Sequence, residues 1–286
     1  MKPTPDTILE QLKSIGVVEG DVLFVTADLM RVGLFLKSRR ETMKTWVDIL
    51  LQAVGKEGTV VAAAYTRTFF RFKKNTEIIF TTDSPSNGGA LSTALLADPR
   101  ALRSLHPTSS CVAIGHNAQE ILHGHDQNSL CYSLLRKLIE YNGKHLMLGT
   151  LDRENAPLGL HYAQELMGIT KTEPTVGLFQ TYYIDQSGQR KLFTRWDVGG
   201  CSRGGYKMLG HLMTENAITI SLIGNAASAL IDAKSATEIA MAALIIDRRA
   251  FICDSLNCLS CRGRWSVSGL GTPAFYFRKY FANKIF

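Results

Sequence analysis

The chain has 286 residues, of which 45% are hydrophobic and 20% charged, as in an ordinary globular protein, and this length and composition exclude a disordered chain. The net charge of +7 favours anionic partners, but no long Lys/Arg run, zinc finger or RNP-type motif points to nucleic acid, and a phosphate-rich cofactor is compatible with the charge. No run of eighteen apolar residues and no signal-peptide core occur, so we expect a cytoplasmic protein without a membrane partner.

Hydrophobic periodicity and turn residues predict an alternation of helices and strands along the chain. Helices are expected at residues 7–15, 41–54, 88–96, 117–122, 132–141, 158–167, 208–213 and 233–246. Asp6 or Thr7 should cap the first of them, and Gly55 should end the second. Strands are expected at residues 22–25, 59–64, 111–114, 145–148, 176–184, 190–196 and 218–222. The strands at 176–184 and 190–196 flank Asp185-Gln186-Ser187-Gly188 and should form a hairpin.

The alternating elements predict an α/β fold in which a mixed sheet lies between helix layers, because a late hairpin does not suit a purely parallel sheet. No linker rich in Pro, Gly or Ser divides the chain. We therefore expect a single domain over residues 1–286, with a cysteine-rich basic tail from about residue 251.

A loop between a predicted helix and a predicted strand, residues 103–110, gathers a cation, an imidazole and several hydroxyls. Its sequence is Arg103-Ser104-Leu105-His106-Pro107-Thr108-Ser109-Ser110. Loops beside strand ends are where α/β proteins place their sites, and the hydroxyls suit carbonyl or phosphate oxygens. The alternative is a loop tied together by its own side-chain hydrogen bonds.

His161 and Glu165 lie one turn apart on the helix expected at 158–167, with Gln164 beside them. A carboxylate at this spacing could orient the imidazole and favour its protonated form, as a general base requires. The alternatives are a surface i,i+4 pair or a metal pair, the latter lacking a third ligand of suitable spacing.

Two further segments carry polar groups at strand or helix ends. Thr26 and Asp28 follow the strand at 22–25, where Asp28 could hold a substrate amine or cap a helix. Ser86, Asn87 and Gly88 precede a helix and could present backbone N–H groups to an anion or merely start that helix.

The six cysteines are expected to be reduced thiols in a protein without an export signal. Cys111 and Cys131 lie in apolar surroundings and are interpreted as packing residues. Cys253, Cys258 and Cys261 could bind zinc with Cys201 or a histidine as fourth ligand. Because this spacing is not a complete zinc signature, we expect no metal and favour unmetallated thiols.

Several of these segments occur in the order typical of one family. Residues 20–29 resemble Gly-Asp-x-Leu-x-Val-His-Ser-Ser-Leu of the aminoglycoside 3-N-acetyltransferase family, and residues 85–91 resemble its Pro-Ser-x-x-Gly-x-Leu. Residues 103–110 are similar to its Arg-Ser-x-His-Pro-Thr-His-Ser, while residues 54–61, 132–149 and 224–246 resemble its remaining strand and helix units. The likeness covers roughly residues 5–247, and several motifs in one order are far more specific than any one alone.

The resemblance implies a direct acyl transfer from acetyl-CoA or another acyl-CoA to the amine of an amino sugar, without a metal. His161 matches the family's helical histidine and is expected to act as the base, with Glu165 and Asp28 as further catalytic candidates. Lys37 is a further guess for the CoA phosphates, and the other cofactor-binding candidates are Thr26, Ser86, Asn87, Gly88, Arg103, His106, Thr108, Ser109 and Ser110. His106 could contact the CoA chain or brace its loop.

The chain departs from the family pattern at several positions. Thr26-Ala27-Asp28 replaces His-Ser-Ser, Ser109 replaces a histidine, Leu158 replaces a threonine, Gln164 replaces the usual glutamate and Leu134 replaces a proline. The resemblance also implies relatives that acylate nucleotide-linked amino sugars of surface polysaccharides. The phosphates of such sugars suit the basic charge, so a sugar of this class is our preferred acceptor. An aminoglycoside antibiotic and a non-catalytic CoA- or sugar-binding relative are the alternatives, and a homodimer is one possible assembly.

Overall fold

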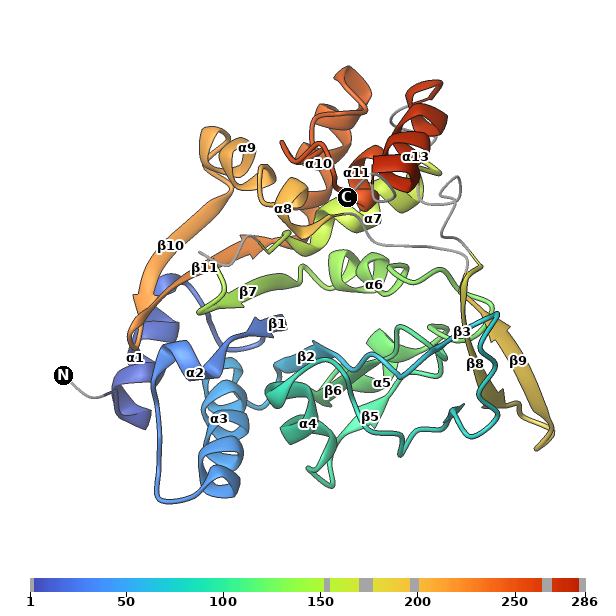
Figure 1. Ribbon diagram of the computed structural model, residues 1–286. Helices are drawn as coiled ribbons and strands as arrows, with labels where there is room; N and C mark the ends of the chain where they lie inside the picture. Colours follow the sequence, from blue (N-terminus) through green and yellow to red (C-terminus); the bar gives the residue numbers. More distant parts are fainter. Residues whose placement is uncertain (1–2, 152–154, 170–176, 196–200, 264–268, 283–286) are drawn as a thin grey trace.

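The computed structural model describes residues 3–151, 155–169, 177–195, 201–263 and 269–282. A seven-stranded sheet lies between helices, and a smaller four-stranded sheet stands beside it (Figure 1). Within these ranges no helix is both long enough and apolar enough for a membrane span.

The main sheet has the strand order β10-β11-β7-β1-β2-β6-β5. Its strands are β1 (Val22–Ala27), β2 (Thr59–Ala63), β5 (Leu102–Arg103), β6 (Cys111–Gly115), β7 (Lys144–Leu148), β10 (Ile218–Ile223) and β11 (Ala226–Asp232). The central strands β7, β1 and β2 run parallel, whereas β6 is antiparallel to β2 and β11 is antiparallel to β7. The prediction of a mixed sheet is therefore confirmed.

Each face of the sheet is covered because successive side chains of a strand point to opposite sides. Leu23 and Val25 of β1 pack in one cluster with helices α1, α3 and α4, while Val22 and Phe24 pack in another with α5 and α6. A third cluster lies beneath α7, α9 and α10. These helices are α1 (Pro5–Ile15), α3 (Arg39–Val54), α4 (Ala90–Leu96), α5 (Ala118–Leu122), α6 (Leu134–Glu140), α7 (Leu158–Leu166), α9 (Met208–Thr214) and α10 (Ala233–Ile246).

The ends of the helices follow from local side-chain chemistry. Helix α3 ends at Gly55 as predicted, but it begins earlier because the Ser38 hydroxyl accepts the Glu41 N–H at 3.1 Å. The prediction that Asp6 or Thr7 caps α1 is wrong. The cap is Thr4, whose hydroxyl accepts the Thr7 N–H at 3.2 Å in a reciprocal capping box.

The predicted hairpin is present as β8 (Phe179–Ile184) and β9 (Arg190–Thr194), although residues 176 and 196 of the predicted strands lie outside the described ranges. It belongs to the smaller sheet, where β8 also pairs with β3 (Phe69–Phe70) and β4 (Ile79–Phe80).

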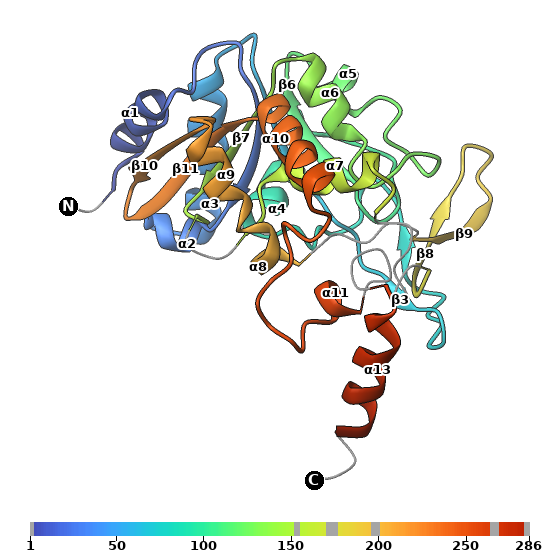
Figure 2. The same cartoon turned by 90° about the horizontal axis from the view of Figure 1, so that it is seen from above.

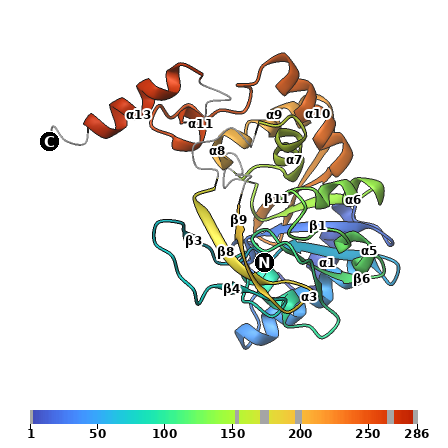
Figure 3. The same ribbon diagram turned by 90° about the vertical axis from the view of Figure 1, so that its right-hand side faces the viewer.

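Periodicity did not predict several short elements or the C-terminal helices. These are α2 (Leu29–Val32), α8 (Ser202–Gly205), α11 (Leu259–Arg262) and α13 (Gly271–Ala282), together with β3, β4, β5 and β11. Helix α13 projects from the body of the protein, next to α11 (Figures 2 and 3).

Candidate active site

The sheet topology brings the ends of several central strands together. The parallel strands β1, β2 and β7 end at one edge of the sheet, and the antiparallel strand β6 begins there. In the sheet, β1 has β2 as one neighbour and β7 as the other. Helix α3, which leads to β2, covers one face of the sheet, whereas α6, which leads to β7, covers the opposite face. Such a switch point leaves a crevice at the carboxyl ends of the strands, where α/β proteins bind ligands.

A crevice of about 950 Å³ lies at this switch point. Asp28 follows β1 and Thr150 follows β7, and both line it. The Thr150 hydroxyl is buried and has no hydrogen-bond partner among the described residues, so a ligand in the crevice could satisfy it. The apolar lining residues include Leu29, Met30, Phe35, Leu36 and Met43. The polar ones include Lys37, Ser38, Arg39 and Asn155.

The mouth of the crevice is cationic. Lys37 and Arg39 are exposed and flank Ser38, the N-cap of the 16-residue helix α3. The first backbone N–H groups of a helix lack partners within it and carry partial positive charge, so phosphate binds well there. Lys37, a candidate from the sequence for the CoA phosphates, therefore lies close to the N-terminus of α3. A phosphate there could contact both the Lys37 ammonium and the first backbone N–H groups of the helix.

The candidate base His161 lies on α7, which begins three residues after the crevice residue Asn155. Its Nδ1 is 3.1 Å from Oε1 of Gln164, and its ring packs against that of Tyr132 with 5.2 Å between centroids. The amide oxygen accepts a hydrogen bond from Nδ1–H, which selects the tautomer in which Nε2 is the basic nitrogen.

Glu165, the predicted partner of His161, is buried and accepts the backbone N–H of Tyr132 at 3.0 Å. Its carboxylate therefore holds the segment before α6 against α7 and keeps the Tyr132 ring beside the imidazole. The sequence did not single out Tyr132. The catalytic roles of His161, Glu165 and Asp28 stay predictions; the Asp28 carboxylate also caps α2, accepting the Arg31 N–H at 3.4 Å.

A second histidine was missed because it lies inside a predicted apolar strand. His145 of β7 is buried, its Nδ1 accepts the Leu158 N–H at 3.2 Å, and its Nε2 lies 3.0 Å from the Thr26 hydroxyl. With Nδ1 accepting, Nε2 must carry the proton and donate to Thr26. Burial lowers the pKa of His145 from 6.5 to about 3, so this ring is a neutral link between β1, β7 and the start of α7.

Arg103, a predicted cofactor ligand, is bound by the protein itself. Its guanidinium donates to the Ala64 carbonyl at 2.8 Å, the Ser110 hydroxyl at 3.0 Å and the Thr82 carbonyl at 3.2 Å, and also to the Ser84 carbonyl. Burial lowers its pKa, and its charge lies over the Phe80 ring. This geometry matches a residue that ties the loop of residues 82–84 to the end of β2.

His106 is fully buried, and its Nδ1 accepts the N–H groups of Thr108 at 3.3 Å and Ser109 at 3.0 Å. Its ring stacks on that of His125 with 4.9 Å between centroids. Of the two roles expected for His106, the structure shows the bracing of its loop.

The hydroxyls expected to bind the cofactor also make internal contacts. Ser109 donates to the Cys131 sulfur at 3.1 Å and Ser110 donates to the Ala64 carbonyl at 2.7 Å, while Thr108 has a buried hydroxyl without a partner among the described residues. Ser86 accepts the Gly88 N–H at 2.8 Å. The exposed Asn87 donates its backbone N–H to the Tyr65 carbonyl at 2.7 Å. Their roles as cofactor ligands stay predictions.

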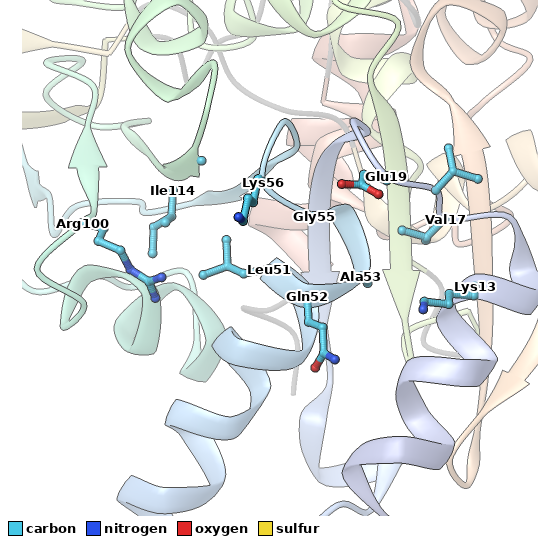
Figure 4. A pocket seen from close by; sticks show the side chains of 12 residues that line it. Lys13, Val17, Glu19, Leu51, Gln52, Ala53, Gly55, Lys56, Arg100 and Ile114 are labelled. Atoms are coloured by element: carbon cyan, nitrogen blue, oxygen red, sulfur yellow. The ribbon is translucent and has the colours of Figure 1, made fainter.

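A larger hollow, of about 1120 Å³, lies at the opposite edge of the sheet, beneath the starts of the parallel strands. Lys13, Glu19, Lys56 and Arg100 line it (Figure 4). None of the candidate catalytic or cofactor-binding residues lines it, and ligands of α/β proteins bind at the other end of the strands. We therefore place the active site at the smaller crevice.

The fold and this crevice define a layered α/β protein with a ligand site at the carboxyl ends of its central parallel strands. The family model described as aminoglycoside 3-N-acetyltransferase matches residues 24–245. This match covers most of the chain, which therefore belongs to that family, as its motifs predicted.

Curated relatives carry the same name. The chain is 30% identical over 182 residues to an aminoglycoside N(3)-acetyltransferase III of Salmonella sp, a match covering 58% of this chain and 62% of the relative. An aminoglycoside N(3)-acetyltransferase IX of Micromonospora chalcea is 27% identical over 187 residues, covering 58% of this chain and 63% of the relative. These matches thus span less than two thirds of the relatives' own length.

Solved structures agree on the fold. The AAC-IIIb binary complex with CoASH superposes with a TM-score of 0.71 at 25% identity, covering 86% of this chain and 97% of the other. The YokD protein from Bacillus subtilis superposes with a TM-score of 0.72 at 19% identity, covering 87% and 95%. AAC-VIa bound to sisomicin superposes with a TM-score of 0.70 at 21% identity, covering 87% and 99%. The predicted fold class is therefore confirmed.

Proposed function

We propose that this protein is a CoA-dependent N-acyltransferase that acetylates an amine of an aminoglycoside. The observation that carries the proposal is the crevice at the β1/β7 switch point, which has cations at its mouth and an apolar wall. The relatives described above are named for aminoglycosides, and one related structure contains CoASH. They support the antibiotic alternative over the nucleotide-linked sugar that the basic charge led us to prefer.

The crevice suits the two chemically different ends of acyl-CoA. The phosphates would lie at Lys37, Arg39 and the N-terminus of α3, where positive charge is concentrated. The pantetheine arm would follow the apolar wall, and its amides could bond the buried Thr150 hydroxyl. The thioester would then lie near the ends of β1 and β7, towards α7.

The residues around α7 supply the acid–base chemistry. An amine is protonated near neutral pH and must lose a proton before its nitrogen can attack the thioester carbon. In this proposal His161 takes that proton on Nε2, with Gln164 holding Nδ1 and the Tyr132 ring limiting its rotation. The nitrogen bonds to the thioester carbon, the carbon–sulfur bond breaks, and the nitrogen gives up its second proton to the released thiolate, so that the products are an amide and free CoA thiol. Asp28 in the crevice is the candidate to hold a substrate ammonium.

Titration of free thiol tests the proposal. The protein is incubated with acetyl-CoA and either an aminoglycoside panel or nucleotide-linked amino sugars, and the acetylated product is identified by mass. We expect thiol release with the aminoglycosides, and a loss of about 10²–10⁴ in kcat for His161→Ala. His123→Ala, an exposed histidine at the end of α5, is the matched control and should keep its rate.

Thiol release that no amine raises above hydrolysis would refute the acyltransferase. Release with nucleotide-linked sugars alone would refute the aminoglycoside acceptor. An unchanged rate in His161→Ala would remove the imidazole from its role.

A second candidate is a relative that binds CoA without turnover, and Gln164 is the observation that favours it. A neutral amide holds the tautomer of His161 but does not stabilise the imidazolium, as a carboxylate would. Tight CoA binding without acyl transfer, together with activity gained in Gln164→Glu, would establish this candidate. A wild-type enzyme that turns over would exclude it.

A further inference from the structure

Three neighbouring cysteines of the C-terminal tail meet a fourth, distant one at the junction of α8, α11 and the segment between α10 and α11. They are Cys201, Cys253, Cys258 and Cys261, and their sulfur atoms all lie within 4.8 Å of one another. Cys253 and Cys261 are buried, whereas Cys201 and Cys258 are half-buried. None of the four forms a disulfide.

We propose that these four sulfurs bind one zinc ion that joins the C-terminal tail to the body of the protein. Zinc bonded to four thiolates at about 2.3 Å sets its sulfurs about 3.8 Å apart at the corners of a tetrahedron. A cluster contained within 4.8 Å needs only a small contraction to reach that geometry. A polynuclear iron–sulfur cluster does not suit it, because iron and sulfide atoms between the cysteines would hold their sulfurs further apart.

The backbone around the cluster is arranged as for a metal site. Cys258 and Cys261 have the two-residue spacing of a metal knuckle, and the Cys253 N–H donates to the Cys261 sulfur at 3.3 Å, a contact that orients a thiolate ligand. Cys201 reaches the other three because Gly204 lets two segments touch. A Cβ at Gly204 would lie 2.3 Å from the Phe251 carbonyl oxygen and 3.0 Å from the Cys253 nitrogen.

The surrounding charge suits a tetrathiolate zinc, which carries a net charge of −2. Arg262 follows the last cysteine and donates to the Cys253 carbonyl at 3.2 Å, and its Nε is buried without a partner among the described residues. The Arg262 side chain is half-buried, and the metal-bound thiolates would place negative charge near its guanidinium.

The tail also needs an additional source of stability. The three hydrophobic clusters found in the described residues include no side chain beyond Phe251. Small modules that lack a core are usually held together by disulfides or metals. Helix α11 lies next to α8 at the edge of the molecule, and α13 projects beyond α11, as Figures 2 and 3 show, so zinc would supply an additional attachment for the tail.

The site also borders the helix that carries His161. A Cβ at Gly205 would lie 2.4 Å from Cβ of Ala156 and 3.0 Å from a methyl of Leu160, so α8 rests directly on the start of α7. The position of α7 should therefore depend on the metal. For the cysteines, the sequence favoured unmetallated thiols over zinc, whereas their arrangement in three dimensions favours zinc.

Metal analysis of the full chain, purified under reducing conditions, tests the proposal. We expect one equivalent of zinc per chain, and replacement by cobalt(II) should produce the visible and near-ultraviolet bands of tetrahedral cobalt thiolate. Cys258→Ser should weaken zinc retention by at least about 10–100-fold, the loss that follows even from removing an outer partner of a ligand. Cys111→Ala, a buried thiol remote from the cluster, is the matched control and should keep its zinc.

Each alternative outcome overturns the zinc site. These outcomes are a metal-free wild-type chain that takes up neither zinc nor cobalt, a disulfide among the four cysteines, or full zinc retention in Cys258→Ser. If that variant does not fold, the metal content and cobalt spectrum of the wild type decide the question. The readout does not depend on acyl transfer, so the zinc site and the proposed activity can fail separately.

Discussion

Replacing His145 with glutamine should remove part of the pH dependence of stability. The folded protein holds this imidazole neutral, with its pKa lowered from 6.5 to about 3 by burial. Below pH 6.5 the unfolded chain binds a proton that the folded chain excludes, so acid destabilises the fold. The contribution is fully present above pH 6.5 and is lost progressively as the pH falls towards 3.

The size of the effect follows from the proton-binding difference. One pH unit corresponds to about 1.36 kcal/mol, so lowering the pH from 6.5 to 5 should cost the wild type about 2 kcal/mol through His145 alone. His145→Gln keeps donors and acceptors near Thr26 and the Leu158 N–H but does not titrate. It is therefore the matched reference for all the other titrating groups.

Urea unfolding of both proteins at pH 7 and pH 5 measures this difference. The free energy of unfolding of the wild type minus that of His145→Gln should fall by about 2 kcal/mol between the two pH values. A difference that stays constant with pH would show that the ring titrates alike in both states, and the account of His145 as a buried neutral link would be wrong.

Two other substitutions test whether Arg103 has a structural role and whether Lys37 binds the cofactor. Arg103→Lys should lower the free energy of unfolding by about 2–4 kcal/mol, because one ammonium cannot reach all the carbonyls that the guanidinium binds; a change as small as that of the exposed Arg100→Lys control would contradict this. Lys37→Gln should raise the KM for acetyl-CoA about fivefold at low salt and less at high salt, because one charge near a phosphate contributes about 1 kcal/mol. Equal KM values for Lys37→Gln and Lys56→Gln, which lies at the opposite hollow, would place the phosphates elsewhere.

Local patterns in the sequence were sufficient for many of the longer elements, although not for β11 or α13. The strand at β1, the end of α3 at Gly55 and all of α10 follow from apolar periodicity and from capping residues, which act over a few neighbouring positions. The contact between His161 and Gln164 also lies within one helical turn, although the sequence paired His161 with Glu165 instead. The family motifs, read in order, also predicted the fold that the solved relatives share.

Contacts between distant segments depended on the order of the strands, which local spacing does not encode. Thr26 meets His145 across 119 positions only because β1 and β7 are neighbours in the sheet. Arg103 likewise donates to the Ala64 carbonyl at the end of β2, a contact between distant segments that local spacing does not predict.

The cysteines show the same division between sequence and structure. The spacing of the last three indicated a possible metal site, but the fourth ligand was undetermined because the sequence offered both Cys201 and a histidine. The packing of α8 against the segment from Phe251 to Cys253 brings Cys201 into the cluster. Local residue patterns thus determined the helices and strands, whereas the neighbours of each strand and the close approach of two backbones decided which side chains meet.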